Sequence, residues 1–219
     1  MRFTTRRNVV SGLGLSGVLG LAGIRPAAAD VVTIDQFKEL IDGILATKGS
    51  LIAAGATVEN GWEKWLQKAI IDTLAEKHIT YDLAPEQHVY DNRDATADFV
   101  GNGPTKDNPN VAVTDKTFVV ELKCQGRNAS LFKAGLEIDC NKLRKREMNA
   151  AYQSARRYVF GVVVAWEPSK GTVESQLLPK GHGFQKYVPM KSRFQDQKQA
   201  ANDKSTDRGG DLYWVEVTQ

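Results

Sequence analysis

Two charged residues interrupt an apolar segment in the middle of the chain, Phe118-Val119-Val120-Glu121-Leu122-Lys123. The apolar and β-branched residues of this segment predict a strand, in which side chains alternate between the two faces. Glu121 and Lys123 therefore share one face, and Val120 and Leu122 share the other. Because a charge buried in a sheet costs free energy unless it has a partner, we expect further charged groups to meet this face.

A second apolar strand is predicted over Ala95–Val100, and it contains the carboxylate Asp98. The turn-rich segment GNGPTKDNPN joins the two strands, so we expect them to pair as antiparallel neighbours. This pairing would bring Asp98 and Glu121 close enough to share a cation. Mg²⁺ prefers oxygen ligands such as two carboxylates and a backbone carbonyl. Lys123 would then orient an attacking water molecule and offset charge on a phosphate.

At these residues the sequence resembles the PD-(D/E)XK phosphodiesterase superfamily, which has the restriction-endonuclease-like fold. The match consists of Asp98 in TADFV, Glu121 and Lys123 in VVELK, and the order of elements over about residues 58–166. The resemblance implies that Mg²⁺ or Mn²⁺ supports hydrolysis of a phosphodiester backbone, usually of DNA and less often of RNA. It also implies a further acidic metal ligand on the preceding helix, where Glu63 is suitably placed.

A basic segment follows these two strands. Residues 122–160 hold nine basic and three acidic side chains, whereas residues 30–121 have a net charge of −8. We expect a helix over Asn141–Arg157 with one polar stripe at i, i+4 spacing; a face that only contacts solvent is the alternative. The residues on or beside this stripe that are predicted to contact a nucleic-acid backbone are Lys142, Lys145, Gln153 and Arg157.

Two cysteines flank the loop between the charged strand and the basic helix. Cys124 follows Lys123 directly, and Cys140 lies 16 residues further on. In an exported protein this pair is a candidate disulfide, which would stabilise the fold by roughly 3 kcal/mol. Two buried free thiols are the alternative.

The first 29 residues have the composition of an export signal. Arg6-Arg7 precedes an apolar run over residues 9–24 that is too short and too rich in glycine for a stable membrane anchor, and small residues end at Ala29. We expect cleavage after Ala29. The arginine pair resembles a twin-arginine signal, with an ordinary secretory signal as the alternative. Both predict recognition by an export machinery and a periplasmic or secreted protein.

The remaining pattern predicts three segments after the signal. Residues 30–57 are expected to form an N-terminal helical extension, residues 58–190 a nuclease-like domain, and residues 191–219 a polar loop and a C-terminal strand. The expected fold class is α/β (α+β), with a mixed central sheet flanked by helices in the order helix, three strands, helix, strand.

Helical spacing over residues 58–78 predicts the first helix of the nuclease-like domain. Two further short strands are expected at Ile79–Leu83 and His88–Tyr90. The unbroken apolar run YVFGVVVAW predicts a strand covered on both faces.

These observations predict an exported metal-dependent nuclease, acting as an antibacterial toxin or a scavenging enzyme. A cytoplasmic inhibitor would be one way to protect the producing cell. Only three histidines are present, and no phosphate-binding Walker loop or serine nucleophile motif occurs. Two alternatives remain, namely a non-catalytic periplasmic binding module on the same fold and a metal-dependent hydrolase of a small phosphate ester. Only a nuclease needs both the carboxylates and the basic stripe.

Overall fold

The computed structural model describes residues 30–218 apart from 49–50, 53–61, 80, 93, 107, 127, 145–147, 165–172 and 189–209. The expected signal peptide over residues 1–29 lies outside the described residues. Lys145 and most of the expected polar loop after residue 190 also lie outside them. Within the described part of the chain, no helix has the length and apolar character needed to cross a membrane.

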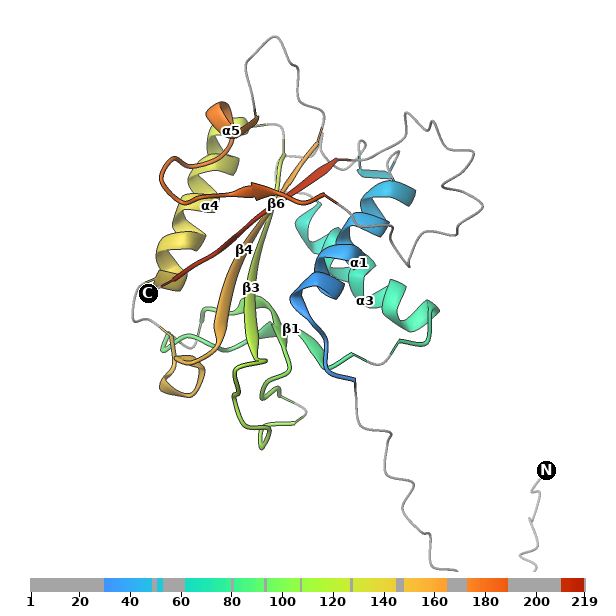
Figure 1. Ribbon diagram of the computed structural model, residues 1–219, viewed down its shortest axis with the longest axis vertical. Helices are drawn as coiled ribbons and strands as arrows, with labels where there is room; N and C mark the ends of the chain where they lie inside the picture. The colour runs from blue at the N-terminus through green and yellow to red at the C-terminus, as the bar shows by residue number, and fades with distance from the viewer. Residues whose placement is uncertain are drawn as a thin grey trace, which may run out of the picture.

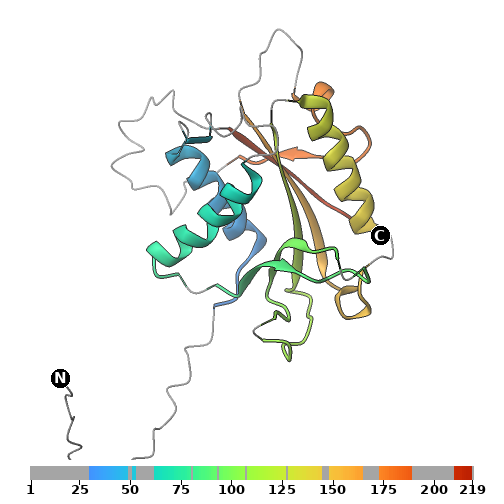
Figure 2. The same cartoon turned by 180° about the vertical axis from the view of Figure 1, so that it is seen from behind.

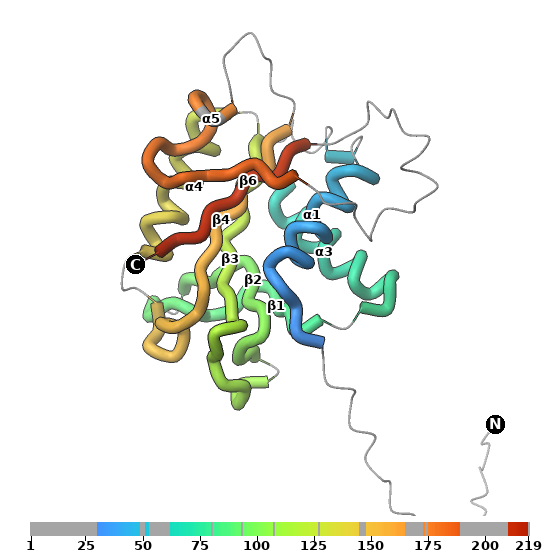
Figure 3. The backbone as a smooth tube through the Cα atoms, in the orientation of Figure 1, coloured from blue at the N-terminus to red at the C-terminus, as the bar shows by residue number. Residues whose placement is uncertain are grey.

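A six-stranded mixed sheet forms the centre of the molecule, and the tube in Figure 3 shows how its chain segments lie side by side. In spatial order its strands are β1 (Leu83–Gln87), β2 (Ala97–Gly101), β3 (Phe118–Cys124), β4 (Arg156–Val163), β6 (Asp211–Glu216) and β5 (Gln185–Lys186). Only β3 and β4 run parallel to each other. Because parallel neighbours need a crossover connection, the helix α4 (Ala129–Arg144) lies between them in the chain.

The sheet has a hydrophobic core on each face. Helices α1 (Ile34–Thr47) and α3 (Glu63–Glu76) cover one face, and α4 covers the other (Figures 1 and 2). Strand β3 contributes to both cores, because Val120 and Leu122 pack with α1 and α3 while Val119 packs with α4. The strand alternation predicted from the sequence is therefore confirmed, and so is a mixed sheet flanked by helices.

Helix α1 packs directly on the centre of the sheet. Thr33 and Gln36 form a reciprocal capping box that fixes where the helix begins. The ring of Phe37 lies 5.3 Å from that of Phe99 and 5.6 Å from that of Phe160, measured between centroids. The segment expected as an N-terminal extension thus supplies part of the core that supports β2 and β4.

The two short strands expected at Ile79–Leu83 and His88–Tyr90 are wrong. A single strand, β1, lies between them over Leu83–Gln87. It is an edge strand whose one partner in the sheet is β2. Its other side faces no strand of the sheet, and an edge position of this kind tolerates Pro85, which has no N–H group to donate. Pairing with β2, rather than an alternating pattern of its own, places this strand.

The helix expected over Asn141–Arg157 is also wrong. Helix α4 ends at Arg144, a short 3₁₀ turn occupies Ala150–Tyr152, and Arg157 is the second residue of β4. Tertiary contacts decide this boundary, because the backbone N–H of Asn149 donates to the carbonyl of Val89. The apolar residues that bury the true helix recur at helical spacing and are Phe132, Leu136, Cys140 and Leu143.

The expected disulfide is not formed. Cys124 and Cys140 are both free thiols. Cys124 packs with the core under α1 and α3, whereas Cys140 belongs to the core under α4. The sheet therefore separates the two sulfur atoms, and a bridge between them would require the strand to move.

Gly101 supplies a test of this packing. A Cβ atom at Gly101 would overlap the ring of Phe118, its partner in β3, and that ring is itself enclosed by Phe37 and Tyr158. We predict that Gly101→Ala lowers the free energy of unfolding by about 1–3 kcal/mol, measured by urea denaturation. Gly101→Ala should cost less free energy of unfolding in a Phe118→Leu background than it costs in the wild-type protein, because the smaller side chain leaves room for the added methyl group. An unchanged denaturation midpoint in Gly101→Ala would contradict the packing.

Candidate active site

The backbone ladder around Asp98 is open on both sides. Pairing between β2 and β3 stops at Phe99, and the Asp98 carboxylate accepts the backbone N–H of Leu122 at 2.6 Å in place of a strand carbonyl. On the other side, pairing with β1 skips Asp98, opposite Glu86, whose φ of 51° lies in the left-handed region. Such interruptions re-aim side chains next to functional sites. Asp98 also accepts a hydrogen bond from the side-chain amide of Gln67 on α3.

Glu121 is buried and faces α4, with a relative exposure of 4%. Its Oε1 atom lies 2.7 Å from the ammonium of Lys142 and also accepts the hydroxyl of Tyr90. The Lys142 ammonium lies 4.2 Å from the centroid of the Tyr90 ring and donates to the carbonyl of Thr96 at 3.4 Å. Glu121 is thus held by partners from α4 and from the segment before β2.

Lys123 lies between two carboxylates that come from different helices. Its ammonium is 3.2 Å from Oε2 of Glu63 on α3 and 3.7 Å from Oδ2 of Asp139 on α4. The lysine side chain is 28% exposed and lies near the end of β3. Both expected charges of β3 therefore have partners, and all of these partners come from other elements.

Helix α3 reaches the site because its first turn is attached to the end of β3. The indole N–H of Trp62 donates to the carbonyl of Gln125 at 2.8 Å. The side-chain oxygen of Gln125 in turn accepts the backbone N–H of Val164, beyond the end of β4. This arrangement places Glu63 in the first helical turn and Gln67 one turn later, on the same face.

The residues around Lys123 and Glu121 form a charged cluster that consists of Glu63, Tyr90, Asp98, Glu121, Lys123, Asp139 and Lys142. Burial raises the pKa values of three of its carboxylates. It raises the pKa of Asp98 to about 7, with a further contribution from the charge of Glu121. It raises the pKa of Asp139 to about 6, although Lys123 opposes this shift. It also raises the pKa of Glu121 despite the charge of Lys142. Burial would lower the pKa of Lys123, but the charges of Asp139 and Glu63 outweigh it and hold this pKa above its usual value.

The structure brings five of the predicted site residues together, namely Glu63, Asp98, Glu121, Lys123 and Lys142. The described residues of the expected basic stripe, Lys142, Gln153 and Arg157, do not share one helix. Arg157 is 4% exposed, and its guanidinium donates to the carbonyls of Leu143 and Gln153. Gln153 ends the short 3₁₀ turn. Lys142 points inward to Glu121, so it has a different environment from the surface position expected for it.

Two residues of the cluster, Tyr90 and Asp139, were missed by the sequence analysis. Tyr90 lies 31 positions before the glutamate that it contacts, and no local pattern connects them. Asp139 could have been found from the apolar spacing of α4. That spacing places Asp139 and Lys142 on neighbouring turns, next to the face that covers the sheet.

The cluster holds four carboxylates and two ammonium groups, with a formal charge of −2 when all six are ionised. Among the described residues, no three His, Cys, Asp or Glu side chains stand in a geometry that could hold a metal ion. Both oxygen atoms of Asp98 and Oε1 of Glu121 accept hydrogen bonds from protein donors instead. Oδ2 of Asp139 is buried without a hydrogen-bond partner in the described part of the chain.

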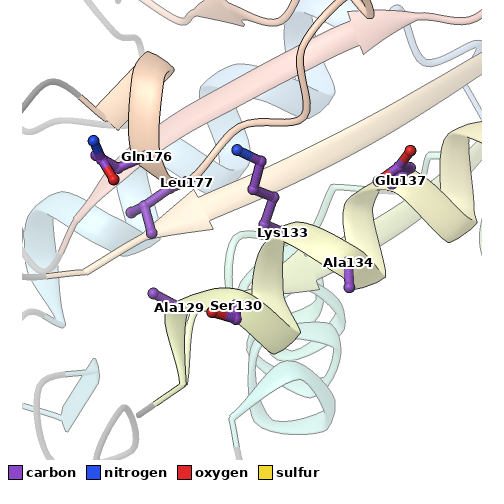
Figure 4. Close-up of a pocket in the computed structure, with 7 residues that line it drawn as sticks. All are labelled: Ala129, Ser130, Lys133, Ala134, Glu137, Gln176 and Leu177. Atoms are coloured by element: carbon purple, nitrogen blue, oxygen red, sulfur yellow. The ribbon is translucent and has the colours of Figure 1, made fainter.

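A hollow of about 320 Å³ lies elsewhere, between α4 and α5 (Val173–Gln176) (Figure 4). Its lining residues are Ala129, Ser130, Lys133, Ala134, Glu137, Gln176 and Leu177. At 100° per residue, Lys133 and Glu137 project from the side of α4 opposite Asp139 and Lys142. The charged cluster, rather than this hollow, is therefore the candidate active site.

Asp98→Asn tests the electrostatics of the cluster in EDTA. Asn is isosteric, and rotation of the Gln67 amide would keep both hydrogen bonds. Because the folded protein holds the Asp98 proton more tightly than the unfolded chain does, the contribution of Asp98 to wild-type stability falls as the pH rises from about 4 to 7. We predict that the variant is more stable by about 1–3 kcal/mol at pH 8 and by less at pH 5, measured by urea denaturation. A variant less stable than wild type at pH 8 would contradict this charge balance.

Comparison of the chain with protein-family models, with curated proteins and with solved structures found no match. The assignment of a function to this protein therefore depends on the chemistry of the site itself.

Proposed function

We propose that this protein is a divalent-metal-dependent nuclease with a restriction-endonuclease-like core. The observation that carries the proposal is the placement of Asp98, Glu121 and Lys123 at the open end of the β2–β3 ladder. Glu63 stands beside them on α3. Buried carboxylates with raised pKa values beside a charged lysine are typical of functional sites, because such an arrangement costs stability.

The donor set suits Mg²⁺ or Mn²⁺. The cluster offers oxygen ligands, which these ions prefer, and its excess negative charge would be neutralised by one divalent cation. Asp98 and Glu121 would hold the ion, with Glu63 as a further ligand. Binding would require these carboxylates to exchange their present donors for the cation, including Lys142 at Glu121.

The residues of the chain would divide the work of hydrolysis. A bound divalent ion would polarise the phosphate and activate water. The Lys123 ammonium would hydrogen-bond the attacking water and stabilise the negative charge that develops on the phosphate. Glu63 would keep this lysine charged and at the end of β3.

The substrate proposed is DNA, or less favourably RNA. The extended basic stripe distinguished a nuclease from a hydrolase of small phosphate esters, and Arg157 is buried in the fold. A hydrolase of small phosphate esters is therefore the second candidate. The third candidate is the non-catalytic binding module, in which Glu121 and Lys123 are charges paired for structure alone.

The proposal of export rests on residues 1–29 of the sequence. A twin-arginine signal would send the folded protein to the periplasm or beyond. There it would act as an antibacterial toxin or a scavenging nuclease, with a cytoplasmic inhibitor as one form of protection.

Cleavage of plasmid DNA, single-stranded DNA and RNA tests the proposed chemistry. We predict cleavage in Mg²⁺ or Mn²⁺ but not in EDTA, and a loss of at least about 100-fold in Lys123→Ala. Lys68→Ala is the matched control, because Lys68 is an exposed lysine paired with Asp72 on α3. Thermal melts establish that each variant is folded.

The other outcomes separate the alternatives. Hydrolysis of bis(p-nitrophenyl) phosphate without cleavage of any nucleic acid would favour the small-ester hydrolase. If the folded protein hydrolyses neither the small ester nor any nucleic acid, the result would favour the non-catalytic binding module. Equal DNA cleavage by wild type and Lys123→Ala would place the reaction away from this cluster.

Metal binding is predicted independently of any substrate. A ligand that binds only the folded state raises its stability, so Mn²⁺ should raise the Tm of the wild-type protein. Glu121→Gln should abolish this increase, because it removes a charged ligand. Glu137→Gln, on the exposed side of α4, should leave it intact. An equal Mn²⁺ effect in wild type and Glu121→Gln would exclude Glu121 as a ligand.

A further inference from the structure

Helix α4 passes unusually close to the stem of Lys123. A Cβ atom at Gly135 would lie 3.1 Å from Cδ and 3.2 Å from Cε of Lys123, closer than side chains normally approach. Glycine inside a helix costs about 1 kcal/mol relative to alanine. The absence of a side chain at Gly135 leaves a path for the lysine along the helix surface.

Asp139 lies one turn after Gly135, on the same face of α4. It is 8% exposed, and its Oδ2 atom is 3.7 Å from the Lys123 ammonium. This oxygen has no hydrogen-bond partner among the described residues. A buried carboxylate oxygen without a donor costs free energy, so its retention beside Lys123 calls for a reason.

Glu63 approaches the same ammonium from the other helix layer, at 3.2 Å. The lysine head therefore has one carboxylate from α3 and one from α4, while its stem follows Gly135. The contact with Glu63 is the closer of the two.

We infer that the Gly135–Asp139 face of α4 is a cradle that positions Lys123, with Gly135 setting the path of its stem and Asp139 the place of its ammonium. This inference rests on the proposed nuclease function, in which Lys123 touches the reacting groups. Asp139 is then a positioning residue that acts through Lys123. A purely structural ion pair would affect stability without affecting the rate.

Single-turnover cleavage of DNA in Mg²⁺ by the full-length protein tests the cradle with Gly135→Ala and Asp139→Asn. Both variants should cleave about 10- to 100-fold more slowly. The half-saturating concentration for DNA binding and the Mg²⁺ concentration that gives half of the maximal rate should stay within about twofold of the wild-type values. Asp139→Glu, which keeps the charge, should recover part of the rate. Glu137→Gln, on the opposite side of α4, is the matched control.

Gly135→Ala separates positioning from stability, because alanine strengthens a helix. A variant with an unchanged or raised Tm and a reduced rate supports the cradle. Wild-type rates in both Gly135→Ala and Asp139→Asn, with Lys123→Ala inactive, would overturn this inference alone. If the wild-type protein cleaves nothing, the proposed function and this inference fail together.

Discussion

The central strand β3 holds two opposite charges, Glu121 and Lys123, within the sheet, and the groups around it offset the free energy that their burial costs. Glu121 cannot turn to solvent, because its face of the sheet is covered by α4, and the side chain of Lys123 is only partly exposed. Each charge needs a partner to remain buried. Lys142 and Tyr90 supply partners for Glu121, and carboxylates from two helices supply them for Lys123.

These partners also explain how the layers are attached to one another. Helix α3 is joined to the end of β3 through Trp62 and Gln125, which brings its first turn to Lys123. Helix α4 faces the sheet with an apolar side that includes Leu136, and next to it with Asp139 and Lys142. The same two helices therefore close the cores and complete the charged cluster.

The cluster is a local conflict within an otherwise consistent fold. Asp98 leaves the backbone ladder to accept the N–H of Leu122, and its pKa rises to about 7 because burial and Glu121 both disfavour its charge. The aromatic rings around Phe37 and the two apolar faces of the sheet provide the stability that tolerates this conflict. Conflicts of this kind are expected at functional sites rather than in structural cores.

The sequence by itself determined the elements that have a strong local period. These include the strands of Asp98 and Glu121, the helices α1 and α3 and the buried strand β4. Burial on one or both faces imposes a repeat of 2 or 3.6 residues or an unbroken apolar run. Local patterns also showed that Glu121 and Lys123 share a face.

The tertiary structure alone decided the rest. The stripe of polar residues through Gln153 had helical spacing, yet a contact of Asn149 with Val89 and the pairing of β4 placed this segment elsewhere. Likewise, Tyr90 and Asp139 join the site, and Cys124 and Cys140 are kept apart, through contacts between residues distant in the chain. Such contacts depend on how the layers pack, and local periodicity does not encode them.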